Sequence, residues 1–329
     1  MLSVPGYKGP TSDHFNGKMF INQQPLQPQG LGALLKFMMR TERQPWRKWT
    51  ENKSYQPPPE RIDSGQLRIT FINHSTVLIQ MDALNILTDP IWSDRCSPFS
   101  WIGPKRHRAP GIPLDNLPPV DLVLLSHNHY DHLDLPTLTR LESRYHMPII
   151  TSLGNKSFLE LNGIANVTEI DWGENTSPFE AVSVTGVPAR HFSGRGISDR
   201  QNTLWMGFVI QGRAGNIYFA ADTGFGPHFE QIRKKFAPIR LALLPIGAYL
   251  PRWFMSGVHI SPEEAVRAHR ILGASTSVAI HFGTFRLGAD GQDQAVDDLN
   301  SALDAVDGPR PRFWALDFGE GRDIPPLSD

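Results

Sequence analysis

The stretch Ser126-His127-Asn128-His129-Tyr130-Asp131-His132 places four potential metal ligands within six residues. It directly follows the apolar run Val120-Asp121-Leu122-Val123-Leu124-Leu125, which is typical of a buried strand. Side chains at the end of such a strand lie on loops that a rigid scaffold holds in place. Imidazoles and a carboxylate crowded there need a cation or a hydrogen-bond network to offset their desolvation. The stretch therefore predicts one half of a two-metal hydrolytic site.

Three later segments repeat the pattern of an apolar run followed by a histidine or an aspartate. They supply His191, Asp222 and His281. Because strand ends converge on one edge of a fold, we expect all of these side chains to meet. The full set of five imidazoles and two carboxylates is too large for one tetrahedral zinc. It suits two borderline metal ions that keep open positions for water.

The spacing inside the first stretch divides the ligands between two ions. His127 and His129 can chelate one ion from the strand end. Asp131 and His132 turn away to face the second ion, and a carboxylate such as Asp222 can bridge both. Two metals about 3.5 to 4 Å apart lower the pKa of a shared water toward about 7, so that a hydroxide nucleophile forms at neutral pH. Such a site needs no serine or cysteine nucleophile.

Composition narrows the function classes. The chain has 329 residues, 40% of them hydrophobic, and a formal charge of -1 from 32 basic and 33 acidic residues. It can bury a large core, but it has no global positive field that would gather nucleic acid. The single cysteine, Cys96, cannot form an intrachain disulfide, which fits a reducing compartment. No secretory signal and no run of about 18 apolar residues is present, so we expect a cytoplasmic protein that does not span the membrane.

The chain divides into an N-terminal arm, residues 1–65, and an α/β catalytic domain, residues 66–329. The arm is rich in Gly, Pro, Gln and Asn and ends in Pro57-Pro58-Pro59. Within it, the apolar residues of 31–39 precede arginines, a lysine and two tryptophans. We favour a short helix packed on the main domain over an interfacial element that binds anionic lipid. In the domain, His74 lies in a turn between two strand-like runs, and we assign it no role beyond lying near the site.

The ligand motif, together with Ala221-Asp222-Thr223-Gly224 and His281, resembles the metallo-β-lactamase superfamily. The resemblance implies a four-layer αββα sandwich with the metals at one edge of two packed sheets. Further blocks are similar to the N-acylphosphatidylethanolamine-hydrolysing phospholipase D branch and extend the resemblance from about residue 7 to residue 320. They are Ser12-Asp13-His14-Phe15, Gly103-Pro104-Lys105-Arg106, Pro188-Ala189-Arg190-His191, Pro245-Ile246-Gly247-Ala248-Tyr249, Pro251-Arg252-Trp253-Phe254-Met255, Pro262-Glu263-Glu264-Ala265 and Ile280-His281-Phe282-Gly283-Thr284-Phe285.

That resemblance implies a role for each ligand. His127, His129 and His191 would hold one zinc ion. Asp131, His132 and His281 would hold the other, with Asp222 bridging. His259 falls where the family has a histidine for the substrate phosphate or the leaving group, which makes Asp131, Asp222 and His259 the catalytic candidates. An apolar wall for acyl chains is predicted from Tyr249, Leu250, Trp253, Phe254 and Met255, and a buried core loop is the alternative interpretation.

The sequence thus predicts a zinc-dependent phosphodiesterase of phospholipase D type. A metal-bridging hydroxide would hydrolyse N-acylphosphatidylethanolamine to phosphatidic acid and an N-acylethanolamine. The expected partner is a phospholipid, with peripheral association of the protein at the inner face of the membrane. The sequence is compatible with a homodimer and with a monomer. Two alternatives stand beside this prediction. One is a metal-dependent hydrolase of a soluble substrate such as a phosphorylated sugar lactone, and the other is a non-catalytic lipid-binding protein, against which the seven ligands argue.

Overall fold

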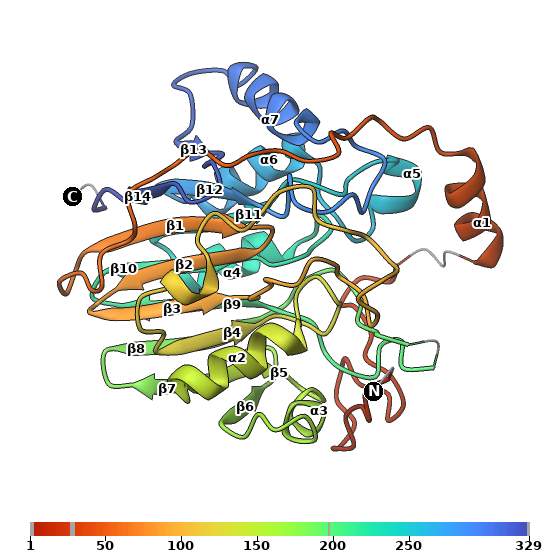
Figure 1. The fold of residues 1–329 in the computed structure, drawn as a ribbon, viewed down its shortest axis with the longest axis horizontal. Helices are drawn as coiled ribbons and strands as arrows, with labels where there is room; N and C mark the ends of the chain where they lie inside the picture. The colour runs from red at the N-terminus through yellow and green to blue at the C-terminus, as the bar shows by residue number, and fades with distance from the viewer. Residues whose placement is uncertain (1–2, 27–29, 197, 328–329) are drawn as a thin grey trace.

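Two mixed β-sheets pack face to face (Figure 1). The computed structural model describes residues 3–26, 30–196 and 198–327, and within them fourteen strands divide evenly between the sheets. The first sheet has the order β14 (Gly321–Asp323), β1 (Leu67–Asn73), β2 (Thr76–Met81), β3 (Leu84–Thr88), β4 (Leu122–Leu125), β5 (Ile149–Ser152) and β6 (Val167–Ile170). The second has the order β13 (Phe313–Trp314), β12 (Thr276–Ile280), β11 (Ile239–Pro245), β10 (Gly215–Phe219), β9 (Gly207–Gly212), β8 (Val182–Val187) and β7 (Asn175–Phe179).

Each sheet combines a meander with a parallel part. In the first sheet, β14 to β3 pair antiparallel and β3 to β6 pair parallel. In the second, β7 to β10 pair antiparallel and β10 to β13 pair parallel. Parallel neighbours need a crossover connection, and these connections carry most of the helices. The carboxyl ends of the parallel strands β4 and β12 therefore become available for loops with ligands.

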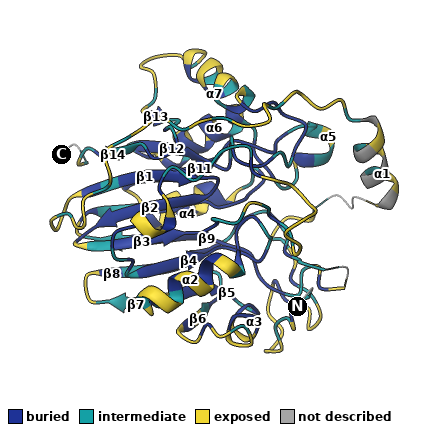
Figure 2. Ribbon diagram, viewed as in Figure 1, coloured by how far each residue is buried: buried dark blue, intermediate teal, exposed yellow. Residues whose placement is uncertain are grey.

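Helices cover the outer face of each sheet, and this arrangement confirms the predicted αββα sandwich. α2 (Leu135–Tyr145) and α3 (Lys156–Glu160) lie on the first sheet. α4 (His228–Phe236), α6 (Pro262–Leu272) and α7 (Gln294–Asp304) lie on the second. α6 begins with a capping box in which Ser261 accepts from the Glu264 amide and the Glu264 side chain accepts from the Ser261 amide. Figure 2 shows most of the strands buried, the edge strands β7 and β14 partly exposed, and the outward faces of α2 and α7 exposed.

Three apolar layers hold the sandwich together. The central layer lies between the sheets and joins residues such as Phe71 of β1 and Leu124 of β4 to Phe208 of β9. The two outer layers lie between each sheet and its helices. Because strands such as β4 and β11 are buried on both faces, they appear in the sequence as continuous apolar runs rather than as alternating ones.

The first part of the N-terminal arm belongs to the central layer. Phe15 and Phe20 are fully buried there, and Tyr7 packs against them. Backbone hydrogen bonds from Tyr7 and Phe20 to Asn202 and Gln201 fix the arm on the connection between β8 and β9. The boundary at residue 65 stays a prediction, but these contacts show that residues 7–20 are not a detached segment.

The apolar segment of the arm forms the predicted helix, α1 (Leu31–Arg40), with a contact to α5 (Arg252–Met255). The Phe37 ring stacks on the Phe254 ring at a centroid distance of 4.8 Å. Met39 is 74% exposed. The side chains of Leu31, Leu34, Leu35 and Met38, which the sequence places in this segment, lie outside the described part of the chain. None of the helices described is long and apolar enough to cross a membrane.

Candidate metal centre

The predicted ligands come from connections at one edge of the sandwich, most of them directly after a strand. His127 to His132 follow β4, His191 follows β8, Asp222 follows β10 and His281 follows β12. Strand ends near this centre have a left-handed backbone, with φ of 48° at His74 after β1, 34° at Asp89 after β3 and 62° at His281 after β12. Non-glycine residues rarely adopt this conformation, and such strain gathers at functional sites. The sharp turns allow side chains directly after a strand to face one centre.

The imidazole half of the centre consists of His127, His129 and His191. Their ligand nitrogens lie within 4.8 Å of one another. His127 Nε2 is 2.9 Å and His191 Nε2 is 3.2 Å from His129 Nδ1. Burial lowers the pKa of all three imidazoles, in the case of His129 to about 4. The rings are therefore neutral at physiological pH, which is the form that binds a metal.

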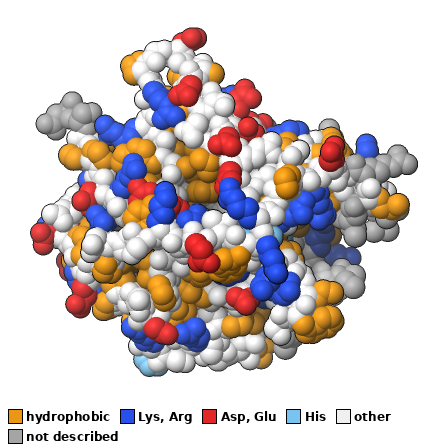
Figure 3. Space-filling model, turned by 45° about the horizontal axis from the view of Figure 1, so that its top comes forward, with side chains coloured by type: hydrophobic (Ala, Val, Ile, Leu, Met, Phe, Trp, Pro, Cys, Tyr) orange, Lys and Arg blue, Asp and Glu red, His pale blue; other side chains and the backbone are white. Residues whose placement is uncertain are grey.

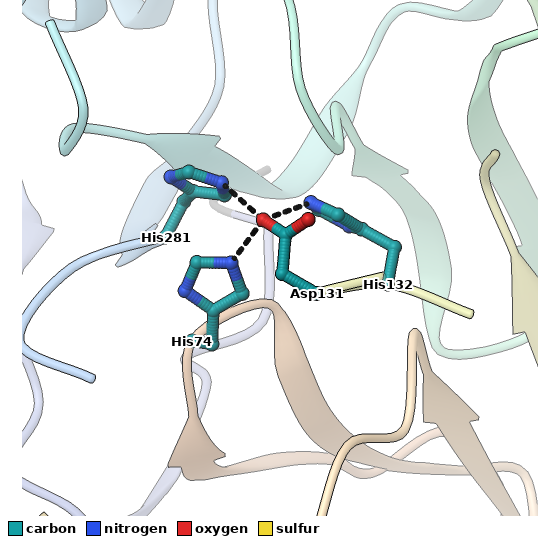
Figure 4. A group of neighbouring side chains, drawn as sticks. All are labelled: His74, Asp131, His132 and His281. Carbon is teal, nitrogen blue, oxygen red and sulfur yellow. Dashed lines mark hydrogen bonds and ion pairs between the residues drawn. The ribbon is translucent and has the colours of Figure 1, made fainter. Parts of the chain in front are cut away.

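The carboxylate half consists of Asp131, His132, His281 and His74 (Figure 4). Asp131 Oδ2 lies 3.3 Å from His132 Nε2, 3.4 Å from His281 Nε2 and 2.9 Å from His74 Nε2. Burial by itself lowers the pKa of His281, but Asp222 and Asp131 outweigh it and raise that pKa to about 9. Burial also lowers the pKa of His132, and the charges of Asp222 and Asp131 outweigh it and raise that pKa. A divalent cation among these groups would supply positive charge that balances the buried carboxylates.

Asp222 joins the two halves. Its Oδ2 lies 3.2 Å from both His132 Nε2 and His281 Nε2, and 3.7 Å from His191 Nε2. The side chain is buried, and its Oδ1 has no hydrogen-bond partner among the described residues. One carboxylate oxygen in reach of imidazoles from both halves is the arrangement that a bridging ligand requires.

The residues fit divalent metal ions. His132 Nε2, His281 Nε2 and Asp222 Oδ1 are buried without hydrogen-bond partners in the described part of the chain. Leaving such atoms unsatisfied costs about 1 to 3 kcal/mol each. Ligand atoms of a tetrahedral zinc site lie about 3.3 Å apart, as follows from a Zn–N distance of about 2.0 Å. The spacings of 3.2 to 3.4 Å around Asp131 and Asp222 match this value.

Two residues that contact the predicted ligands, one behind the centre and one within it, were missed by the sequence reasoning. Asp89 Oδ2 accepts from His132 Nδ1 at 2.7 Å and from Ser126 Oγ at 2.6 Å. This bond leaves His132 Nε2 directed at the centre, as carboxylate partners of metal-bound histidines do. His74, to which the sequence gave no role beyond nearness, lies within the carboxylate half. Both residues follow strand-like runs directly, so the pattern that identified the other ligands could have found them.

The remaining predicted site residues are His259 and the five residues of the predicted acyl-chain wall. His259 lies beside the centre, whereas the wall residues differ in burial. His259 is buried, and its Nδ1 lies 4.0 Å from Asp222 Oδ2 without a hydrogen-bond partner among the described residues. Tyr249 packs in the core of the second sheet, and its hydroxyl donates to Asp298 of α7. Among the other predicted wall residues, Met255 is buried, whereas Trp253 is 44% exposed. The five residues predicted as an acyl-chain wall therefore do not share one surface.

Comparisons with known proteins agree with this geometry. A sequence profile of the beta-lactamase superfamily domain matches residues 84–282. This chain belongs to the metallo-β-lactamase superfamily. N-acyl-phosphatidylethanolamine-hydrolyzing phospholipase D 1 of Caenorhabditis elegans is 37% identical over 270 residues, which cover 78% of this chain and 76% of that protein. A metal-dependent hydrolase of Methanopyrus kandleri is 29% identical over 222 residues, 67% of this chain and 85% of that protein.

A solved structure shows the same superfamily fold. A metallo hydrolase from the archaeon Ignicoccus hospitalis is 20% identical, with a TM-score of 0.58, and the match covers 79% of this chain and 99% of that one. The metallo-β-lactamase fold, the convergent ligands and the metal-dependent relatives together identify a hydrolase that uses a divalent metal. They also confirm the resemblance to the phospholipase D branch of the superfamily.

Proposed function

We propose that this hydrolase is a zinc-dependent phosphodiesterase of phospholipase D type that acts on N-acylphosphatidylethanolamine. The observation that carries the proposal is the pairing of the imidazole and carboxylate halves through Asp222 in a chain 37% identical to a phospholipase with this substrate in its name. Two zinc ions held by these residues would supply a hydroxide nucleophile at neutral pH and neutralise charge on the phosphoryl group. Water would add to phosphorus, and the bond to the ethanolamine oxygen would break, which leaves phosphatidic acid and an N-acylethanolamine.

The protein's own groups support this reaction in two ways. Asp131 and Asp222 are buried and would hold the two ions in a fixed relation. His259 presents an unpartnered Nδ1 beside Asp222, from which it can hydrogen-bond to a phosphoryl oxygen or to the leaving alcohol. A residue outside the centre helps to fix the backbone of His259, because Arg252 Nη1 donates to the His259 carbonyl at 2.9 Å.

Exposed apolar side chains support a substrate presented in a bilayer. Phe99, Trp101 and Ile102 are 42%, 72% and 51% exposed within four residues of one loop. The same loop returns to the centre, because Arg106 bridges to Phe285, whose ring lies 5.4 Å from the His74 ring. Aromatic residues with nearby cations are typical of surfaces that enter the membrane interface. Figure 3 shows basic and hydrophobic side chains side by side on the part of the surface toward α1.

The region of α1 and α5 adds a second apolar surface of this kind. A cavity of about 270 Å³ is lined by residues that include Lys36, Leu250 and Trp253. Lys36 Nζ lies 4.5 Å from the centre of the Trp253 ring. Two of the predicted wall residues, Leu250 and Trp253, thus border a cavity that could take part of an acyl chain, with Lys36 and Glu42 as its charged lining residues.

Turnover of vesicle-bound lipid tests the proposal. The protein is incubated with vesicles that contain N-acylphosphatidylethanolamine, plain phosphatidylethanolamine or phosphatidylcholine, and in parallel with a phosphorylated sugar lactone. We expect equal amounts of phosphatidic acid and N-acylethanolamine from the first vesicles, loss of the activity after chelation and its return with Zn²⁺. Hydrolysis of the soluble substrate alone would overturn the proposal.

Cosedimentation with the same vesicles tests the membrane contact. Replacing Phe99 and Trp101 with serine should release the protein from vesicles that the unchanged chain binds. Leu161→Ser is the matched control, since Leu161 is 64% exposed and follows α3 directly, outside this loop. Equal binding by both variants would contradict a role of the loop in membrane contact.

A further inference from the structure

Asn22, in the N-terminal arm, holds the backbone of a predicted metal ligand. Its Nδ2 donates to the His191 carbonyl at 2.8 Å, and the His191 amide donates to Asn22 Oδ1 at 3.0 Å. His191 lies in the connection after β8, outside the sheet ladder. The planar amide of Asn22 therefore gives His191 both the acceptor and the donor that a neighbouring strand would otherwise supply.

The arm that carries Asn22 is itself firmly attached. Phe20, two residues earlier, is fully buried in the central layer, and its amide donates to the Gln201 carbonyl at 2.8 Å. His14 is buried between Asp13 and Asp171, and its ring stacks on Trp172. Asn22 thus lies two residues from a buried and hydrogen-bonded part of the arm. This attachment fixes the position of its side-chain amide relative to His191.

The His191 ring is oriented by a second contact. Its Nδ1 donates to the Val258 carbonyl at 3.0 Å, which leaves Nε2 for the centre. With the backbone held by Asn22 and the ring held by Val258, Nε2 lies 3.2 Å from His129 Nδ1 and 3.7 Å from Asp222 Oδ2. Loss of the hydrogen bonds to Asn22 or of the hydrogen bond to the Val258 carbonyl would let His191 Nε2 move relative to the other predicted ligands. Outer partners of this kind are worth about 10-fold to 100-fold in metal affinity.

We propose that Asn22 is a positioning residue of the metal centre, through which the N-terminal arm sets the place of His191 in the imidazole half. The metal affinity of that half then depends on a segment far away in the sequence. The proposal rests on the metal centre and not on the phospholipid substrate. Measurements of metal binding alone therefore test it.

Cobalt titration of matched variants tests the proposal. All variants are made in an Asp131→Asn background, which removes the carboxylate of the carboxylate half so that the remaining Co²⁺ reports the imidazole half. Asn22→Ala removes both hydrogen bonds to His191. Asn16→Ala is the control, since Asn16 Oδ1 also accepts two hydrogen bonds in the same arm, from Lys18 and Met19 at 2.9 Å, without reaching the centre.

We expect Asn22→Ala to weaken Co²⁺ binding by about 10-fold to 100-fold and to change the visible absorption of the bound cobalt. Asn16→Ala should leave both properties unchanged, although each variant lowers the melting temperature of the metal-free protein. A merely structural role of Asn22 predicts that the two variants behave alike. Equal cobalt affinity and equal spectra in both would overturn the proposal.

A second variant keeps the test decisive if Asn22→Ala does not fold. Asn22→Asp retains the size of the side chain and the acceptor for the His191 amide, but it places a carboxylate oxygen against the His191 carbonyl. We expect the same loss of cobalt affinity and a shifted spectrum, and an unchanged affinity would again overturn the proposal. Absence of cobalt binding by the unchanged chain would instead refute the metal centre itself, which separates the two failures.

Discussion

The two halves of the metal centre differ in charge and in what holds them in place. The imidazole half has three neutral rings, and one of them depends on Asn22 of the arm and on the Val258 carbonyl. The carboxylate half contains Asp131 and is supported by Asp89 behind His132. A buried carboxylate attracts a cation far more strongly than a neutral imidazole does. We infer that the carboxylate half binds its ion more tightly, whereas the imidazole half is the one that its surroundings can tune.

The largest effect should come from the residue that both halves share. Asp222→Asn removes the negative charge between His132, His281 and His191 while it preserves the size of the side chain. Turnover should fall by more than about 100-fold, the upper range for an outer partner of a ligand, because Asp222 is a predicted ligand itself. Steady-state hydrolysis and circular dichroism of the same sample measure activity and fold. A variant with near-normal activity would show that Asp222 does not bridge the halves.

A smaller effect, confined to one half, should follow from Asp89→Asn. The variant weakens the bond that orients His132, so the affinity of the carboxylate half should fall by about 10-fold to 100-fold. The imidazole half should lose less, because Asp89 reaches it only through Ser126, whose Oγ lies 2.8 Å from His127 Nδ1. Metal competition with a chelator of known affinity measures both. Asp115→Asn, which affects only an exposed ion pair with Arg140, is the control. Equal losses from the two halves would contradict the separation between them.

The features that could be predicted from the sequence are those with a short local sequence pattern. A histidine or aspartate directly after an apolar run marked the seven candidate ligands, which the structure brings together, and Ser261 with Glu264 marked the start of α6. His74 and Asp89 follow the same rule, but each stands alone in a turn, where most such residues only form hydrogen bonds. Asn22 carried no signal, because its partner lies 169 residues away and an amide contact to backbone leaves no local pattern.

The predicted acyl-chain wall shows why a local pattern cannot assign a surface. Tyr249 and Trp253 are four residues apart in one apolar segment, yet Tyr249 lies in the core and Trp253 is 44% exposed. Which side of a short segment faces solvent depends on packing against α7 and α1, and neither contact is encoded near the segment.

The smallest effect concerns the arm that holds the imidazole half. Burial by itself lowers the pKa of His14, but hydrogen bonds and ion pairs with Asp171 and Asp13 outweigh it, so the pKa is raised above 6.5. The stabilisation is therefore fully present below about pH 6.5, the value in the unfolded chain, and is lost as the pH rises through the folded-state pKa.

The difference in free energy of unfolding between the unchanged chain and His14→Gln measures this contribution. It should shrink by about 1 kcal/mol or less between pH 6 and pH 9, since Asp13 is exposed. Denaturant titrations at both pH values provide the numbers. A difference that grows with pH would contradict the charged state of His14 in the folded arm.

Zinc binding to the metal-stripped protein tests the two-half centre most directly. Equilibrium dialysis against increasing Zn²⁺ should give two ions per chain in two steps. Asp131→Asn should abolish the tighter step and spare the weaker one, and His191→Ala should do the reverse. A single ion per chain, or two ions that are lost together in both variants, would contradict a centre built from an imidazole half and a carboxylate half.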